Sequence, residues 1–464
     1  MSAARIVELA YAPDTPRRFE ALNAGPWSVM LDSGHPGTQQ GRYDILAAEP
    51  YATLTTRGSL TEIRSGGSVE LSERDPLELL TQCLGPRAES VPGIPFAGGA
   101  IGYFAYDLGR RFEELPSFAE PDIDLPDMAV GLYDWALITD HRLRKTYLVA
   151  QGRCPATFER WSGLLDRVQA TSFPRPRSFE VCSAVHSNLD RASYGRAFDR
   201  IQHYIREGDC YQVNLAQRFS IRTKGDPWDA YLQLRELNPA PYSAFMSITE
   251  GSILSASPER FLQVRDGAVE TKPIKGTRPR SFSKERDRAL AVELRESAKD
   301  RAENVMIVDL LRNDLGKNCA PGSIAVPRLF EVESFASVHH LVSTVTGRLA
   351  ANRHPLDLLR GCFPGGSITG APKVRAMEII EELEPHRRSV YCGSVGYVGF
   401  DGSMDCSIAI RTLVAHAGSL HAWAGGGIVA DSQVEAEYQE SLDKADAALK
   451  LMAIERVSRV GSGQ

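Results

Sequence analysis

The stretch LHAWAGGGIVADSQVEAEYQESLDKADAALK, residues 420–450, joins a strand-like run to a helical one. Its first part, LHAWAGGGIVA, is mostly small and apolar and ends at a polar turn, as expected of a strand. The second part predicts a helix from about residue 434 to residue 454, with a buried stripe of Tyr438, Leu442, Ala445 and Leu449. A strand that leads into a covering helix indicates a fold that mixes sheets and helices.

A second face of this predicted helix is charged. Glu437, Glu440 and Lys444 recur at the spacing i, i+3, i+7, and residues 425–427, just before the helix, are all glycine. A solvated face with ion pairs is the ordinary explanation of such a pattern. Consecutive glycines, however, let another group approach the backbone closely. The sequence leaves open whether this face is a surface or part of a binding site.

Strand-like and helical runs also alternate on the N-terminal side of this stretch. YQVNLAQRFSI, SVGYVGF and IAIRTLVAH are strand-like, whereas residues 284–312 form a long helical run. Residues 1–175 carry short strand-like runs separated by turns, and TSFPRPRSFE is a connection. We therefore expect an α+β fold of the mixed α/β type, with a sheet-rich region over residues 1–175 and a second domain over residues 186–456.

The composition is that of an ordinary globular protein. The chain has 464 residues, 43% of them hydrophobic and 24% charged, and its formal net charge of -6 argues against a nucleic-acid-binding surface. The N-terminus has no signal-peptide pattern, and no apolar run is long enough to span a membrane. Eight cysteines without a CxxC pair indicate neither a disulfide framework nor a zinc site, so a reduced cytoplasm is expected.

A lysine is held in a rigid setting in TKPIKGTRPR, residues 271–280. Pro273 and Gly276 predict a tight turn, which would fix the backbone of Lys275. A fixed lysine would serve as a surface cation, a carboxylate clamp or a nucleophile, and these residues alone do not decide among them. Glu259, in SASPERF, would reach the same cavity through a hairpin, with a turn carboxylate as the alternative.

Two further motifs have the residue types of a binding site. In KDRAENVMIVDLLRND, Glu303 lies at the edge of the apolar face of a helix. Carboxylates from two helices, here Glu303 and those of the final helix, suit Mg²⁺, which prefers oxygen ligands. In FPGGSITGAPKVRAMEII, a glycine loop leads into a helix whose N-terminus would accept a carboxylate or a phosphate. A solvated helix surface and a helix-capping turn are the respective alternatives.

Three other polar residues lie in apolar surroundings. Arg411 in IAIRTLV and Tyr391 in VYCGSVG lie in or beside strand-like runs, where each needs a partner. Arginine binds carboxylates through two parallel hydrogen bonds, although a structural salt bridge explains Arg411 equally well. His340 in SVHHLVSTV has an apolar context, where a lone histidine is more often a hydrogen-bonded core residue than a catalytic one.

Taken in order, these motifs resemble those of the chorismate-utilising enzymes. The resemblance is carried by SPERF, PIKGT, KDRAEN, HHLVST, FPGGSITGAPKVRAMEII, GYVGF, SIAIRT and AGGGIVADS, and it is dense over residues 190–452. It implies large antiparallel sheets packed as a β-sandwich with helices on the outside, and a chorismate-binding catalytic domain over residues 186–456. It further implies the aminodeoxychorismate branch, which converts chorismate and ammonia to 4-amino-4-deoxychorismate on the route to 4-aminobenzoate and folate.

The resemblance also implies roles for individual residues. It assigns the essential Mg²⁺ of the family to Glu303 and Glu440, with Glu437 close by. It makes Lys275 the nucleophile at C2 of chorismate and Glu259 the general acid on the departing C4 hydroxyl, after which ammonia adds at C4 and expels the lysine. The active-site histidine and the substrate contacts are assigned to His340, Thr277, Gly276, Tyr391, Arg411, Gly425 and Lys444.

Sister branches of the family differ at informative positions. Relatives that form anthranilate have alanine at the position of Lys275, and relatives that form isochorismate or salicylate have a water-activating lysine near Gln212. The chain has no glutaminase cysteine motif, since Cys362 lies in RGCFPGG, so the resemblance implies a separate glutamine amidotransferase subunit as the source of ammonia. The segment LDSG resembles the lining of a tryptophan pocket, in which Ser33 is the residue of interest.

Three other functions are compatible with parts of this pattern. The chain would form anthranilate, or would be a non-catalytic, tryptophan-binding regulatory subunit, or would use Lys275 as the Schiff base of pyridoxal phosphate. The presence of Lys275 argues against the first alternative, and the complete set of acidic and basic site residues argues against the second. No phosphate-binding cup is visible for the third.

Overall fold

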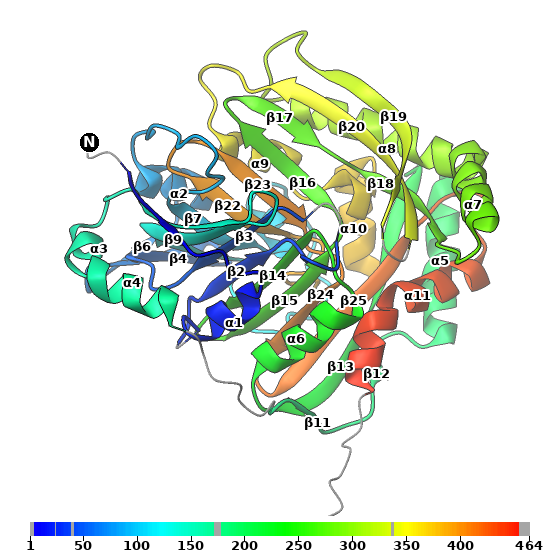
Figure 1. The fold of residues 1–464 in the computed structure, drawn as a ribbon. Helices are drawn as coiled ribbons and strands as arrows, with labels where there is room; N and C mark the ends of the chain where they lie inside the picture. The colour runs from blue at the N-terminus through cyan, green and yellow to red at the C-terminus, as the bar shows by residue number, and fades with distance from the viewer. Residues whose placement is uncertain (1–3, 24, 39–40, 171–177, 336–337, 454–464) are drawn as a thin grey trace, which may run out of the picture.

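The structure is a computed structural model that describes residues 4–23, 25–38, 41–170, 178–335 and 338–453. Two large sheets form its centre, and helices pack around them (Figure 1). The predicted fold, antiparallel sheets packed as a sandwich with helices on the outside, is confirmed. None of the helices in the described ranges is long and apolar enough to cross a membrane.

The first sheet takes strands from the whole length of the chain, and its strand pairs are antiparallel. In order across the sheet they are β1 (Arg5–Leu9), β10 (Lys145–Ala150), β9 (Trp135–Asp140), β3 (Tyr43–Ala47), β2 (Val29–Asp32), β14 (Tyr242–Ser247), β15 (Gly251–Ser257), β24 (Thr412–His416), β25 (Ser419–Ile428), β13 (Gln212–Lys224) and β11 (Glu180–Val181). Two short strands, β12 (His186–Ser187) and β21 (Gly370–Ala371), also pair with β13.

The second sheet is also antiparallel and also draws on both halves of the chain. Its strands, in order, are β18 (Ile274–Pro279), β20 (Val338–Arg348), β17 (Ala268–Thr271), β16 (Arg260–Arg265), β23 (Met404–Ile408), β22 (Ser394–Gly399), β7 (Gly99–Phe104), β8 (Met128–Tyr133), β4 (Ala52–Arg57), β5 (Leu60–Ser65) and β6 (Ser68–Ser72). β19 (Ala325–Ser334) pairs with β20.

Helices surround the two sheets. They are α1 (Thr15–Glu20), α2 (Pro76–Leu84), α3 (Pro155–Glu159), α4 (Trp161–Gln169), α5 (Arg191–Glu207), α6 (Pro227–Leu237), α7 (Lys284–Glu296), α8 (Ala298–Gly316), α9 (Pro355–Cys362), α10 (Lys373–Leu383) and α11 (Val434–Met452). Two short 3-10 helices are η1 (Tyr106–Arg111) and η2 (Gly366–Ile368).

The larger core lies between the two sheets. In β14, Ala244 and Met246 belong to this core, whereas Phe245 between them belongs to a second cluster on the opposite face. This alternation is the period of two expected of a strand that is buried on both faces. Helices α1, α4, α6 and α11 contribute to the second cluster, and a third cluster joins α5 and α10 to β13.

Both sheets continue across the predicted boundary between the N-terminal region and the second domain. β2 pairs with β14 in the first sheet, and β7 pairs with β22 in the second. The larger core also contains residues from both parts. The boundary between residues 1–175 and residues 186–456 therefore divides the sequence but not the sheets, and the division into two domains stays a prediction.

The tight turn predicted around Lys275 is wrong. The segment forms β18, and its pairing with β20 is irregular between Ile274 and Thr277. Gly276 has φ +83°, the left-handed conformation that such a bulge requires and that glycine adopts readily. Lys275 therefore projects from a bulge in an edge strand and not from a turn.

The single helix predicted over residues 284–312 is also wrong, because the structure has two helices there. Ser297 ends α7 and begins α8 with a non-helical ψ of 112°. Its hydroxyl accepts a hydrogen bond from the backbone N–H of Asp300 at 3.3 Å, which is the usual action of a serine N-cap. The apolar spacing continues across Ser297, so the spacing alone did not reveal the break.

Candidate active site

Several predicted site residues converge on the side of the molecule away from the N-terminus, where β18, α8 and α11 lie (Figure 1). Lys275 belongs to β18, Glu303 to α8, and Glu440 and Lys444 to α11. All three of these charged neighbours influence the pKa of Lys275, as does Glu259. The fold thus gathers residues that are up to 185 positions apart in the sequence.

Lys275 is partly buried and has a partner for its amine. Its Nζ donates a hydrogen bond to the backbone carbonyl of Ser367 at 3.4 Å. Burial lowers the pKa of Lys275, an effect that Glu303 opposes and Lys444 reinforces. A lowered pKa increases the fraction of neutral amine, the form that acts as a nucleophile.

Glu259 lies between β15 and β16 and is 6% exposed. The hydroxyl of Ser367 donates a hydrogen bond to its Oε1 at 3.0 Å. Burial raises the pKa of Glu259 to about 7, against the opposing effects of this hydrogen bond and of Lys275. A carboxyl group with a pKa near the working pH is suited to general acid catalysis. Ser367 contacts both Glu259 and Lys275, so the structure brings these two residues together.

The charge of Glu440 acts on two further carboxylates, those of Glu303 and Glu437. A Cβ on Gly426 would lie 3.1 Å from Glu437 Oε2 and 3.7 Å from Glu440 Oε1, so both carboxylates approach the backbone of β25 closely at this glycine. Burial raises the pKa of Glu303 and of Glu437, and the charge of Glu440 raises each of them further. Carboxylates that repel one another in this way are stabilised by a nearby cation.

The predicted metal site is not a preformed cluster. Within the described ranges, no group of three His, Cys, Asp or Glu side chains is arranged to hold a metal ion. Glu303, Glu437 and Glu440 nevertheless supply the negatively charged oxygen ligands that Mg²⁺ prefers, so their chemistry fits this ion. The assignment of Mg²⁺ to these residues stays a prediction.

Lys444 connects α11 to β25. Its Nζ forms an ion pair with Glu440 Oε1 at 2.6 Å and donates a hydrogen bond to the backbone carbonyl of Gly425 at 3.0 Å. Burial acts to raise the pKa of Glu440, but Lys444, together with Lys275 and Lys299, outweighs it and the pKa is lowered. Glu440 is therefore ionised at neutral pH. The predicted charged face of the final helix thus points at least partly into the site.

His340 lies next to the bulge that carries Lys275. Thr277 Oγ1 and His340 Nδ1 are 2.9 Å apart, across the pairing of β18 with β20. Burial lowers the pKa of His340 to about 4, and the positive charge of Arg411 adds to this shift. His340 is therefore neutral at physiological pH, and its catalytic role stays a prediction.

Tyr391 lies close enough to Arg411 to influence the pKa of the guanidinium. Arg411 has φ +53°, and its guanidinium donates a hydrogen bond to the backbone carbonyl of Lys444. Burial lowers the pKa of Arg411, and Tyr391 opposes the shift. In the part of the chain that the structure describes, Arg411 forms no ion pair, which leaves its guanidinium available to a carboxylate. Tyr391 stacks on Trp423, with ring centroids 6.0 Å apart and planes at 7°.

The predicted stripe of α11 packs against the core, but the buried face of the helix is broader than this stripe. Ala445 is buried, and Tyr438, Leu442 and Leu449 are half-buried against the second and third clusters. The buried residues of the helix are Glu437, Ser441, Ala445, Leu451 and Met452. The face includes polar groups because β13 offers them partners: Gln217 Nε2 donates a hydrogen bond to Ser441 Oγ at 2.6 Å. Apolar spacing alone does not reveal such a face.

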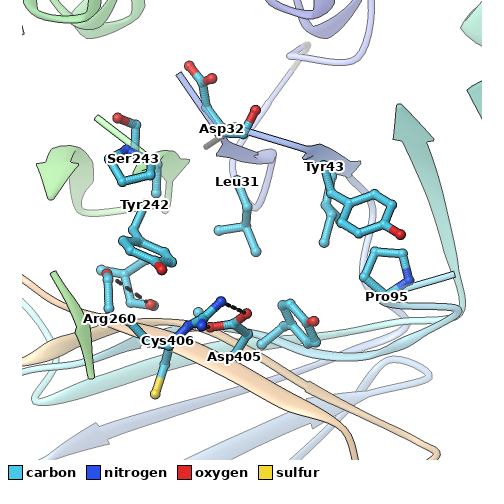
Figure 2. Close-up of a pocket in the computed structure, with 18 of the residues that line it drawn as sticks. Leu31, Asp32, Tyr43, Pro95, Tyr242, Ser243, Arg260, Asp405 and Cys406 are labelled. Carbon is cyan, nitrogen blue, oxygen red and sulfur yellow. Dashed lines mark hydrogen bonds and ion pairs between the residues drawn. The ribbon is translucent and has the colours of Figure 1, made fainter. Parts of the chain in front are cut away.

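Ser33, the residue predicted to line a tryptophan pocket, lies at a cavity of about 180 Å³ between the two sheets. Figure 2 shows Leu31 and Tyr43 from the first sheet on one side of this cavity and Arg260 and Asp405 from the second sheet on the other. Arg260 and Asp405 form two hydrogen bonds, of 3.1 and 3.2 Å. The cavity is distinct from the surroundings of Lys275, although Arg260 directly follows Glu259 in the chain.

Ser367 is a contact residue that sequence analysis did not single out. It lies in the quoted motif FPGGSITGAPKVRAMEII, but a serine within a glycine loop carries no chemical signal of its own. Arg388 is a second such residue: it is 1% exposed, forms an ion pair with Glu384 at 2.6 Å and donates a hydrogen bond to the carbonyl of Ile368 at 2.9 Å. Only the folded structure places these groups at the site.

Comparison with known proteins agrees with this geometry. The profile of the chorismate binding enzyme family matches residues 29–450. Aminodeoxychorismate synthase component 1 of Klebsiella aerogenes is 52% identical over 453 residues, 97% of this chain and 99% of that protein. The protein of the same name from Escherichia coli (strain K12) is 52% identical over 436 residues, 93% of this chain and 94% of that protein.

A solved structure is similar over most of its length. The crystal structure of anthranilate synthase component I from Streptococcus pneumoniae TIGR4 has a TM-score of 0.79 and 33% sequence identity, and the match covers 88% of this chain and 92% of that chain. The family profile and these relatives extend over both sheets and all of the residues gathered around Lys275. The chain therefore belongs to the chorismate binding enzymes, the chorismate-utilising family that its motifs predict.

Proposed function

We propose that the protein is component 1 of an aminodeoxychorismate synthase, which converts chorismate and ammonia to 4-amino-4-deoxychorismate and water. Two relatives that carry this name are each 52% identical over nearly the whole chain. An anthranilate synthase component I has a similar structure at a lower identity of 33%, so that activity is the second candidate. The residues around Lys275 favour the first.

The observation that carries the proposal is that Lys275 and Glu259 both contact Ser367 and influence each other's pKa. The amine has a lowered pKa and the carboxyl group a raised one, both chiefly through burial. Both shifts increase the neutral forms, a nucleophilic amine and a carboxylic acid that can donate a proton. An enzyme that adds ammonia at C4 by way of a lysine adduct at C2 needs these two groups side by side.

The proposed reaction proceeds in two displacements. The amine of Lys275 bonds to C2, the ring double bonds shift, and the C4 hydroxyl leaves as water with the proton of Glu259. Ammonia then bonds to C4, the double bonds return, and the bond between C2 and Nζ breaks, which releases Lys275 as a neutral amine. The new ammonium group at C4 returns one proton to Glu259, so that both residues regain their starting states.

The test is product analysis of the purified protein with chorismate, Mg²⁺ and ammonium salt at mildly alkaline pH. We expect a product that retains the enolpyruvyl group and that an added lyase converts to 4-aminobenzoate. Lys275→Ala should reduce the rate by about 100-fold or more. Lys272→Ala is the matched control, because Lys272 pairs with Glu333 at 2.8 Å and has no role in the proposed reaction. Anthranilate from the wild type would overturn the proposal.

The proposed enzyme uses Mg²⁺, held by Glu303 and Glu440 with Glu437 close by. When bound, the ion would neutralise the carboxylates and bind a carboxylate of chorismate. The repulsion that Glu440 exerts on Glu303 and on Glu437 supports this assignment. Addition of Mg²⁺ should raise the melting temperature of the wild type at neutral pH and leave that of Glu303→Gln nearly unchanged. An equal increase in both proteins would show that the ion binds at a site without Glu303.

The proposed enzyme receives ammonia from a glutamine amidotransferase subunit, as the word component in the names of its relatives suggests. Binding of tryptophan at the cavity beside Ser33 is part of the same proposal. Ser33 Oγ donates a hydrogen bond to Asp44 Oδ1 at 2.7 Å, so its hydroxyl helps to hold this wall of the cavity. Calorimetric titration with tryptophan tests this binding. A heat of binding in the wild type that is absent in Ser33→Trp supports the site, and the absence of any heat of binding in the wild type rejects it.

A further inference from the structure

A single residue, Ser367, lies between the two groups to which the proposed reaction assigns chemistry. It belongs to the short helix η2 and is 8% exposed. Its hydroxyl contacts Glu259 and its carbonyl contacts Lys275. These contacts come from opposite ends of the same residue, so any displacement of Ser367 changes the positions of both groups.

The contact with Glu259 selects which carboxyl oxygen carries the proton. Ser367 Oγ donates a hydrogen bond to Oε1 at 3.0 Å. Because Oε1 accepts this hydrogen bond, its unprotonated state is favoured when the carboxyl group is neutral. The proton of neutral Glu259 is therefore disfavoured on Oε1 and favoured on Oε2, while the backbone N–H of Ile274 is a second hydrogen-bond donor to the carboxylate. A rotated carboxyl group would present the wrong oxygen.

The contact with Lys275 orients the amine. A neutral amine has two N–H donors and one lone pair, and Nζ directs one N–H at the carbonyl of Ser367 at 3.4 Å. This contact restricts rotation about the last bond of the side chain, so the lone pair is limited to fewer directions. Orientation of a nucleophile in this way reduces the entropy lost in reaching the transition state.

Ser367 is itself firmly held. The carbonyl of the next residue, Ile368, accepts a hydrogen bond from the buried Arg388 at 2.9 Å. The hydroxyl of Thr369 donates to the carbonyl of Gly365 at 3.0 Å, which closes the loop on the other side. A loop fixed at both flanks holds Ser367 in one position and does not need to rearrange during the reaction.

We propose that Ser367 is a positioning residue that sets the reactive oxygen of Glu259 and the reactive direction of the Lys275 amine. This inference rests on the proposed function, because it takes the general acid and the nucleophile from it. Ser367 does not itself exchange protons or form bonds with substrate. Its effect is exerted through the two groups that it contacts.

The test uses Ser367→Ala, which removes the hydroxyl and keeps the carbonyl. We expect kcat to fall by roughly 10- to 100-fold, the effect of losing a hydrogen bond to a carboxylate. Because that hydrogen bond favours ionised Glu259, its loss raises the pKa of Glu259, and the alkaline limb of the kcat profile should move up by roughly half to one pH unit. The other titratable groups that act on Glu259, which are Lys275, Lys444 and Cys392, are unchanged in this variant.

Thr369→Val is the matched control, since Thr369 braces the same loop and contacts neither Glu259 nor Lys275. Its alkaline limb should remain at the wild-type position. Ser367→Cys, with a weaker donor of similar size, should give a smaller fall in kcat and a shift in the same direction, and it serves if the alanine variant does not fold. A wild-type kcat, or an alkaline limb that stays in place in both Ser367 variants, overturns the inference. Failure of the wild type to form aminodeoxychorismate would instead overturn the proposed function.

Discussion

At the scale of single residues, the site depends on a lysine and a glutamate whose charges are both disfavoured by burial. Burial lowers the pKa of Lys275 and raises that of Glu259, so the neutral forms of both groups are favoured near neutral pH. Each residue also carries a charge that would stabilise the ionised form of the other. The balance keeps both groups able to change their protonation during a reaction.

The raised pKa of Glu259 has a consequence for stability. Its carboxyl pKa is 4.5 in the unfolded reference and about 7 in the folded protein, so the folded state holds the proton more tightly. The contribution of neutral Glu259 is complete below pH 4.5 and is lost as the pH rises through 7. The loss amounts to roughly 3 kcal/mol at most.

Glu259→Gln should therefore lower the activity of the protein and, at high pH, raise its stability relative to the wild type. We expect kcat to fall by roughly 10²- to 10⁴-fold, the usual contribution of a general acid. The melting temperature of the variant, relative to the wild type, should be higher at pH 9 than at pH 5. Thermal unfolding followed by circular dichroism at both pH values measures this.

The control for this comparison is Glu114→Gln, a change at an exposed glutamate remote from the site. Its difference in melting temperature from the wild type should be the same at both pH values. If the difference for Glu259→Gln is equally independent of pH, the carboxyl group is not protonated in the folded protein and its role as an acid is rejected.

At the scale of elements, the bulge in β18 determines where Lys275 points. The bulge exists because Gly276 adopts φ +83°, and it fits because α7 and α8 approach this glycine closely. A Cβ there would lie 2.9 Å from Asp300 Cγ and from Leu294 Cδ1. A regular strand would turn successive side chains to opposite faces, and Lys275 would not be presented in the same way.

Gly276→Ala should therefore reduce both stability and activity. Left-handed strain and close contact together should cost roughly 2–4 kcal/mol of the free energy of unfolding, and the displaced Lys275 should lower kcat. Gly267→Ala provides the comparison, since Gly267 has φ +75° in the β16–β17 hairpin but open space around its Cβ position. That change should cost only roughly 1–2 kcal/mol and preserve kcat. Equal losses in urea unfolding would contradict the close contact.

Helix α11 presents polar residues to the site from a face that is partly buried. Its buried face carries Glu437 and Ser441, each with a partner: Ser432 Oγ donates to Glu437 Oε1 at 2.7 Å, and Gln217 donates to Ser441. Satisfied hydrogen bonds make the burial of these polar groups tolerable. The helix thereby presents Glu437, Glu440 and Lys444 toward β25.

At the scale of the whole molecule, the two sheets join the N-terminal and C-terminal parts of the chain. Residues 186–456 alone would lack the partners of β14 and β22, which are β2 and β7. The cut would expose two strand edges in the middle of the sheets and remove one part of the shared core. The site around Lys275 draws its own residues from the C-terminal part, but those residues depend on the complete sheets for their positions.

The fragment 186–456 should consequently fail to unfold cooperatively. We expect broad or absent thermal transitions and association through the exposed edges when it is produced alone. Production together with residues 1–175 should restore a single sharp transition, because the missing strands are supplied in trans. A cooperative transition of the isolated fragment would instead establish it as an independent domain.

The sequence by itself determined the fold class and the family, and it predicted most of the candidate site residues. Alternating apolar runs predict the sheets because a strand buried between layers repeats every second residue, as in β14. The ordered motifs identify the family, because glycine, proline and charged residues recur in it at fixed spacings. This pattern can be recognised even when the positions of the residues in space are unknown. Glu259, Lys275, Glu303, Arg411 and Glu440 were found in this way.

The tertiary structure decided what depends on contacts between distant segments. The bulge at Gly276 requires the approach of α7 and α8, the polar face of α11 requires the partner that β13 supplies, and the role of Ser367 requires that η2 lie between Glu259 and Lys275. In each sheet, a strand pair also joins regions that the sequence separates by a proline-rich connection: β2 with β14 in the first sheet and β7 with β22 in the second. Local patterns report which face of an element is apolar, but hydrogen-bond partners and pKa shifts arise only when separate elements pack together.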